Sequence, residues 1–230
     1  MSTRRRRKIG LIFLALLALI LLLPAGVMLI YRAVPPPVTP LMLMRGGKIQ
    51  YTWVPMTRIA PVLARSVFTA EDENFCRHHG FDATALQKAL DDYLEDDGGT
   101  LRGGSTISQQ TAKNVFLWPD RTWLRKGLET WFTVYLEALW PKQRIMETYL
   151  NVVEWAPGVY GAEAAARHHF KKSAAQLSPH EAALLAAVLP NPRKWNASDP
   201  GPYVRSRAVT LEERATKVGQ LASCLSASKL

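Results

Sequence analysis

The sequence predicts a mainly α-helical domain behind a single N-terminal transmembrane helix. Residues 9–30 carry no charge and are rich in Leu, Ile and Ala. Beyond them, apolar residues recur at helical spacing in most segments, and no convincing run of alternating strand residues appears. The chain has 230 residues and is 48% hydrophobic, which allows one domain of ordinary size plus an appendage.

The apolar segment is long enough to cross a bilayer. As a helix, 22 residues rise about 33 Å, against a hydrocarbon core of about 30 Å. A cleaved signal peptide is the alternative, but its apolar region is shorter and a small-x-small cleavage site should follow. We therefore expect an uncleaved anchor in the inner (cytoplasmic) membrane. The basic residues 4–8 place the N-terminus in the cytoplasm and the main domain in the periplasm.

The charge of the chain favours anionic lipid or a diphosphate as a partner. The formal net charge is +10, of which residues 4–8 supply +5, so a bias of +5 remains for the rest. Nucleic acid is not expected, because no nucleic-acid-binding motif is present. Cys76 and Cys224 pair if the compartment is oxidising, but an inert buried thiol at Cys76 is equally compatible with the sequence.

The chain divides into five expected parts. Residues 1–8 form a cytoplasmic tail, 9–30 the anchor, 31–41 a stiff Pro-rich linker, 42–223 the main folded domain, and 224–230 a C-terminal tail. In residues 124–139 the apolar side chains lie on one helical stripe, and Ser178 with Glu181 forms a capping box. Helices are expected over residues 57–75, 81–94, 105–115, 124–139, 142–151, 162–170, 178–189 and 203–221.

An acidic motif, EDENFCRHHGFD, occupies residues 71–82. Glu71 ends an expected helix, where the helix dipole raises the pKa of a carboxylate toward the value near 7 that suits a general base. A solvated acidic cluster is the simpler interpretation of these residues alone. The neighbouring pairs His78–His79 and His168–His169 lack the spacing of a helical zinc pair, so no metal ligands are assigned.

A second motif, GGSTISQQTAKN, occupies residues 103–114. Thr106 and Gln109 form a capping box after a glycine turn, and the free N–H groups of such a helix start suit an anion. Polar side chains then follow at helical spacing, although such a face is usually only solvated. The candidates for substrate binding in this motif are Ser105, Gln109, Gln110, Lys113 and Asn114.

A cationic segment follows. Arg121, Arg125 and Glu129 are spaced four residues apart, with Lys126 beside them. One interpretation is a helical salt bridge, worth about 0.2–0.5 kcal/mol. The other is a diphosphate clamp, in which Arg supplies forked donors and Lys a point charge.

Taken in order, these motifs resemble those of the family 51 glycosyltransferases, in their monofunctional, biosynthetic peptidoglycan transglycosylase form. The first motif fits E-D-x-x-F-x-x-H-x-G-x-D, and the second fits except that Thr111 and Ala112 replace commoner residues. The resemblance covers roughly residues 58–207. It also includes R-x-x-x-R-K-x-x-E at residues 121–129, RIMETYLN at 144–151 and GAEAAAR at 161–167.

The resemblance implies a lysozyme-like, mostly helical fold and the polymerisation of lipid II into glycan strands. Glu71 matches the general base, and Glu129 the second essential carboxylate. The growing strand, lipid II and the membrane are the implied partners, with wall-synthesis or cell-division proteins in addition. A divalent metal, Mg or Mn, occurs in parts of the family. The positions matching the diphosphate-binding residues are Lys113, Arg121, Arg125 and Lys126.

Two other functions compete with this one. A lysozyme-like hydrolase or lytic transglycosylase needs a general acid and no diphosphate clamp, so the cationic segment argues against it. A non-enzymatic membrane scaffold of the wall-building machinery needs neither carboxylate, so the presence of Glu71 and Glu129 argues against it.

Overall fold

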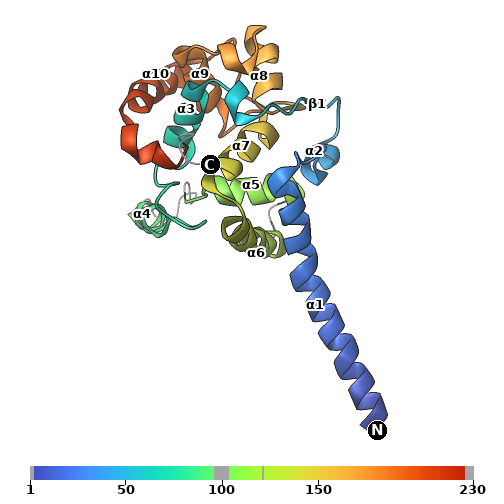
Figure 1. Ribbon diagram of the computed structural model, residues 1–230. Coiled ribbons are helices and arrows are strands. Elements are labelled where there is room, and N and C mark those ends of the chain that lie inside the picture. The colour runs from blue at the N-terminus through green and yellow to red at the C-terminus, as the bar shows by residue number, and fades with distance from the viewer. Residues whose placement is uncertain (1–2, 96–103, 121, 226–230) are drawn as a thin grey trace.

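In the computed structural model, a long N-terminal helix projects from a body built mainly of shorter helices (Figure 1). The structure describes residues 3–95, 104–120 and 122–225. Its α-helices are α1 (Thr3–Ala33), α2 (Pro40–Arg45), α3 (Pro61–Glu71), α4 (Ala83–Glu95), α5 (Ile107–Phe116), α6 (Trp123–Leu139), α7 (Lys142–Val152), α8 (Ala162–Phe170), α9 (Pro179–Val188) and α10 (Pro202–Lys217). Short 3-10 helices are η1 (Met56–Arg58), η2 (Ala174–Gln176) and η3 (Gly219–Leu225).

The expected helices are present, with corrected ends. Residues 57–75 are not one helix, because Pro61 occupies the first turn of α3 and the chain leaves helical geometry at Asp72. The capping box of Ser178 and Glu181 starts α9 as expected. Helix α2 was not expected, and it falls partly in the segment assigned to the linker.

A small sheet was also not predicted. It contains β1 (Gln50–Tyr51), β3 (Val159–Tyr160) and β2 (Glu154–Ala156) in that order, with β1 parallel and β2 antiparallel to β3. Strands of two or three residues are too short to show alternation in a sequence. Gly158 turns the chain between β2 and β3 at φ +75°, where a Cβ atom would lie 2.5 Å from the Lys48 carbonyl oxygen.

The core places the ends of α3 and α5 next to each other. Helix α9 is buried from Ala182 to Val188 and packs against α3 and α10. Helix α5 packs against both α6 and α7. Glu71 at the end of α3 lies beside α5, because Gln110 of α5 donates a hydrogen bond to it, and α5 packs against the helix that carries Arg125 and Glu129.

Helix α6 presents polar side chains to the interior. Its buried residues are Arg125, Glu129, Thr133 and Leu136. The apolar stripe found in the sequence is divided: Leu136 is fully buried, and Phe132, Tyr135 and Leu139 pack against the core, whereas Leu124 is 70% exposed. Helix α6 therefore buries charged and apolar side chains together.

The connection after α1 lies on the body rather than forming a free spacer. Met28 near the end of α1 is fully buried, while large side chains between residues 9 and 23 are exposed. The Tyr51 hydroxyl donates to the Pro36 carbonyl oxygen at 2.8 Å within the Pro-rich segment. Residues 7–33 are long and apolar enough to cross a membrane, on the criteria of length and composition.

Candidate active site

Glu71 is held by a chain of hydrogen bonds from two other helices. The Gln110 side-chain amide donates to Glu71 Oε2 at 2.7 Å, from α5. The Tyr149 hydroxyl, on α7, donates to Gln110 Oε1 at 3.3 Å and thereby fixes which way the amide points. Tyr149 therefore orients the Gln110 amide, and the Gln110 amide orients the carboxylate of Glu71.

Burial raises the pKa of Glu71 above its ordinary value of 4.5. The hydrogen bond from Gln110 and the positive charges of Arg207 and Lys113 lower the pKa, but they do not cancel the effect of burial. The direction agrees with the sequence-based expectation, although desolvation rather than the helix dipole is the leading cause. A carboxylate with a raised pKa is a stronger base than a solvated one.

The raised pKa of Glu71 predicts how the activity falls on the acidic side of its pH profile. Glu71 accepts a proton only when ionised, so kcat/KM should fall as the pH falls through a value above 4.5. The Gln110 hydrogen bond lowers that pKa, so Gln110→Leu should move this fall to still higher pH. We would measure kcat/KM against pH for both proteins. If kcat/KM of Gln110→Leu fell at the same pH as that of wild type, the fall would reflect ionisation of the substrate and not of Glu71.

Asp72 holds the start of α5 in place. Its carboxylate accepts from the Ile107 backbone N–H at 2.9 Å and contacts His78 Nε2 at 2.9 Å. His78 Nδ1 accepts from the Gly80 N–H at 3.1 Å, so the ring proton sits on Nε2 and is donated to Asp72. The Thr106 hydroxyl donates to the Gly80 carbonyl oxygen at 2.7 Å. Much of the acidic motif therefore positions α5.

Glu129 is a buried carboxylate with two cationic partners. Arg125 Nη1 lies 2.6 Å from Glu129 Oε2, and Lys126 Nζ lies 2.5 Å from Glu129 Oε1. The Lys126 side chain is 42% exposed and that of Arg125 only 10%. The two interpretations of the cationic segment, a helical salt bridge and a diphosphate clamp, are therefore compatible. Glu129 holds Arg125 and Lys126 in place, and both cations have further N–H groups that can donate to a ligand. Arg121 lies outside the described residues.

Lys113 lies in the electric fields of both carboxylates. Burial lowers its pKa, Glu129 and Glu71 raise it, and Arg125 and Arg45 lower it. No hydrogen bond or ion pair within the described part of the chain engages its ammonium group. A largely buried cation without a fixed partner can bind an anionic ligand without first breaking an internal ion pair.

The remaining candidates divide between the surface of a cleft and the interior. Glu71 and Ser105 line a cleft of about 460 Å³, and Arg125 and Lys126 line a second one of about 210 Å³. Gln109 and Asn114 are buried, and the side chain of Gln109 is used in the capping box. Within the described ranges, no group of three His, Cys, Asp or Glu residues is arranged to hold a metal ion.

A family model for transglycosylases matches residues 41–216 of this chain. The chain belongs to the transglycosylase family. It is similar to proteins named biosynthetic peptidoglycan transglycosylase from three bacteria. That of Rhodospirillum centenum is 54% identical over 217 residues, covering 92% of this chain and 93% of the relative. Those of Caulobacter vibrioides and Pseudomonas aeruginosa are 51% and 50% identical, covering 91% and 83% of this chain and 94% and 85% of the relatives.

Membership of the transglycosylase family confirms the resemblance and the mainly helical, lysozyme-like fold. Three residues near its site were not found by sequence analysis. Tyr149 lies in the fourth motif, which offered a signal that was not used. Arg207 on α10 and Arg45 on α2 act on Glu71 and Lys113 through their charges, and no local pattern marks either of them.

A disulfide joins Cys76 to Cys224, which settles the alternative left open by the sequence. It ties the acidic motif to η3 across a sequence separation of 148 residues. Cys76 lies between Asp72 and His78, so the crosslink stabilises the loop that holds α5. A disulfide is consistent with an oxidising compartment.

Loss of this disulfide should lower the free energy of unfolding by about 4–5 kcal/mol, because a crosslink that closes a long loop restricts the unfolded chain. Denaturant unfolding in detergent, with and without reductant, measures the effect. Cys76→Ser/Cys224→Ser should match the reduced native protein and should not respond to reductant. An unchanged unfolding midpoint after both thiols are shown to be free would contradict the prediction.

Proposed function

We propose that this chain is a peptidoglycan glycosyltransferase that polymerises lipid II into β-1,4-linked glycan strands. The observation that carries the proposal is Lys113, a largely buried cation between the candidate base Glu71 and the Arg125–Glu129 pair. A base next to a cationic group suits the transfer of a sugar from a diphosphate leaving group. The names of the relatives, biosynthetic peptidoglycan transglycosylases, point to the same reaction.

In the proposed reaction, Glu71 takes the proton from the 4-hydroxyl of lipid II. That oxygen attacks the anomeric carbon of the growing strand, and the bond to the polyprenyl diphosphate breaks. The donor is α-linked, so attack from the opposite face gives a β linkage. The developing negative charge is stabilised by Lys113, Arg125 and Lys126, with Arg121 as a further candidate. Cations thereby replace the acid that a sugar leaving group needs.

Glu129 supports the reaction by aligning cations. Its two oxygens contact Arg125 and Lys126 separately, and only 5% of its side chain is exposed. Two cations on one carboxylate leave a net positive charge at the second cleft. This arrangement favours an orienting role for Glu129 over proton transfer. Every proposed step uses side chains of the chain and the substrate alone.

We propose that α1 is a single-pass anchor in the inner membrane, with its basic end in the cytoplasm and the body in the periplasm. Trp123 at the start of α6 is 91% exposed and Leu124 is 70% exposed, on a helix that packs against α1. Apolar side chains beside an anchor suit the bilayer surface. The site on the buried face of α6 would then lie close to lipid-linked substrates.

Sequencing the N-terminus of the membrane-extracted protein tests the anchor. We expect residues 9–30 to be retained, because the apolar run exceeds the length of a signal peptide and no cleavage site follows. Met28 is also part of the core, so cleavage within α1 would remove a packed side chain. A mature chain that begins beyond residue 24 would remove the anchor from the mechanism.

Incubation of the detergent-solubilised protein with labelled lipid II tests the function. Polymer is the expected product. Degraded glycan from added strands would instead indicate a lysozyme-like hydrolase, and an unchanged substrate would favour a scaffold. Heat-inactivated protein at the same concentration is the control for carried-over polymerase activity.

A further inference from the structure

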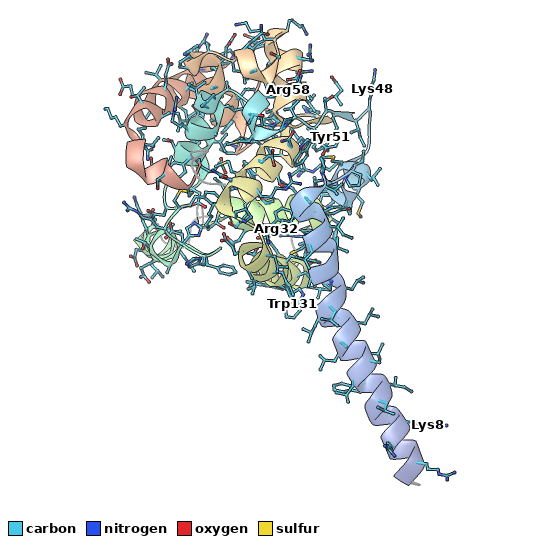
Figure 2. All side chains as sticks on the ribbon, viewed as in Figure 1. Lys8, Arg32, Lys48, Tyr51, Arg58 and Trp131 are labelled. Carbon is cyan, nitrogen blue, oxygen red and sulfur yellow. A yellow bond between two sulfur atoms is a disulfide. The ribbon has the colours of Figure 1, made fainter. Side chains whose placement is uncertain are left out.

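The end of α1 is built into the body of the protein. Met28 is fully buried, and the Trp140 indole N–H donates to the Met28 carbonyl oxygen at 2.7 Å. Figure 2 shows α1 entering the body near Arg32 and extending away from it to Lys8. The anchor and the catalytic domain therefore share a packed interface.

Arg144, on α7, binds the carbonyl groups at the end of α1. Its Nη2 donates to the Tyr31 oxygen at 2.7 Å and to the Val34 oxygen at 2.9 Å, and its Nε donates to Tyr31 at 3.1 Å. The last carbonyls of a helix lack partners within the helix, and a cation there is favoured by the helix dipole. Arg144 thus caps a helix that lies more than 100 residues away in the sequence.

Other groups hold Arg144 itself in place. Its guanidinium lies 4.9 Å from the ring centre of Trp53 and 5.9 Å from that of Trp140. Its Nη1 lies 2.6 Å from Glu147 Oε2, and only 11% of its side chain is exposed. We call Arg144, Trp140 and Trp53 the anchor collar.

An aromatic stack extends from the collar toward the candidate site. Tyr31 of α1 stacks on Phe116 at 6.1 Å, and Phe116 stacks on Phe132 at 4.9 Å. Phe116 is the last residue of α5, which carries Lys113, and Phe132 lies on α6, one turn after Glu129. The end of the anchor is therefore in contact with the two helices that carry the cationic group.

We propose that Arg144 is a positioning residue that fixes the catalytic domain at one height and tilt on the membrane. The apolar run from residue 9 to the buried Met28 is about 30 Å long as a helix, which matches a hydrocarbon core of about 30 Å. If the contact between Arg144 and the end of α1 is rigid, the distance of the catalytic domain from the membrane surface depends on the thickness of the bilayer. This inference rests on the proposed function only in that the substrate is bound to lipid.

A distance measurement tests whether this contact is rigid, without any use of activity. The only two cysteines of the sequence are paired, so Ile20→Cys on α1 and Val209→Cys on α10 can be spin-labelled alone. Both positions are exposed, at 60% and 54%. In bilayers we expect a narrow distance distribution, which Arg144→Ala broadens. Trp140→Phe, which loses the N–H bonded to Met28, should broaden it less and serves alone if Arg144→Ala does not fold.

An activity measurement tests the consequence. Polymerisation by the full chain would be assayed in detergent and in vesicles of increasing acyl-chain length. Arg144→Ala should stay within about twofold of wild type in detergent but lose about tenfold in vesicles of the optimal thickness, and its dependence on thickness should flatten. Arg58→Ala, an exposed arginine on η1, is the matched control and should behave as wild type in both.

The outcomes separate this inference from the proposed function. Identical distance distributions and thickness profiles for wild type and Arg144→Ala would overturn the role of Arg144. Equal losses in detergent and in vesicles would show that Arg144 only supports folding. If wild type makes no polymer at all, the proposed function fails, while the spin-label distances still decide whether the contact is rigid.

Discussion

Glu71→Gln should lower the rate of polymerisation by about 10²-fold or more while lipid II still binds. The amide keeps the size of the carboxylate and removes its ability to accept a proton. In the structure, Gln110 donates to the side chain at position 71, and an amide oxygen there can still accept that bond. The variant therefore changes the chemistry with little change in packing. Single-turnover polymerisation and a lipid II binding assay measure the two effects separately.

The stability of the same variant provides an independent check. Burial raises the folded-state pKa of Glu71, so its ionised form destabilises the fold once the pH exceeds the unfolded value near 4.5. Glu71→Gln should therefore be at least as stable as wild type at neutral pH. Glu213→Gln, at an exposed carboxylate of α10, is the matched control and should alter neither property. Near-normal turnover by Glu71→Gln would end the assignment of the base.

Lys113→Met should slow polymerisation by about 10²–10³-fold without destabilising the protein. Methionine keeps the length of the side chain and removes the charge that would stabilise the diphosphate. Burial lowers the pKa of Lys113, so its protonated form destabilises the fold once the pH lies below the unfolded value of 10.5. Its removal should leave the unfolding midpoint unchanged or raised. Loss of activity with gained stability is the signature of a residue kept for function.

Substitutions of the neighbouring cations Arg125 and Lys126 should affect activity and stability differently from Lys113→Met. Arg125→Ala should also cost about 2–4 kcal/mol of the barrier, but it removes the closest partner of the buried Glu129 and should lower stability as well. Lys126→Ala should lose rate with little loss of stability, because the Lys126 side chain is 42% exposed. If all three variants kept wild-type rates, the cationic group would be only a salt-bridge cluster.

Features fixed by neighbouring residues were predictable from the sequence. The capping boxes that start α5 and α9 depend on residues three positions apart, and both are present. Their motifs also led to Glu71 and Lys113, whose roles stay predictions. The start of α3 was missed although Pro61 marks it locally. The raised pKa of Glu71 was expected, but its leading cause required knowledge of burial.

Features made by distant residues were not predictable in this way. The disulfide joins residues 148 positions apart, and Arg144 binds carbonyls 110 to 113 positions away. Every residue has a backbone carbonyl, so no sequence motif shows that Arg144 of α7 binds the carbonyl groups at the end of α1. The apolar stripe of α6 was visible in the sequence, but the sequence alone did not show that Arg125 and Glu129 of the same helix are buried as well.

The configuration of the newly formed linkage tests the central claim most directly. Purified protein would be given α-linked lipid II, and the polymer would be analysed by NMR at the anomeric carbon. One general base and a cationic leaving-group site predict complete inversion, and hence only β-1,4 linkages with no dependence on a covalent glycosyl-enzyme. An α linkage, or anhydro ends from strand cleavage, would contradict the account of Glu71 as the base of an inverting transfer.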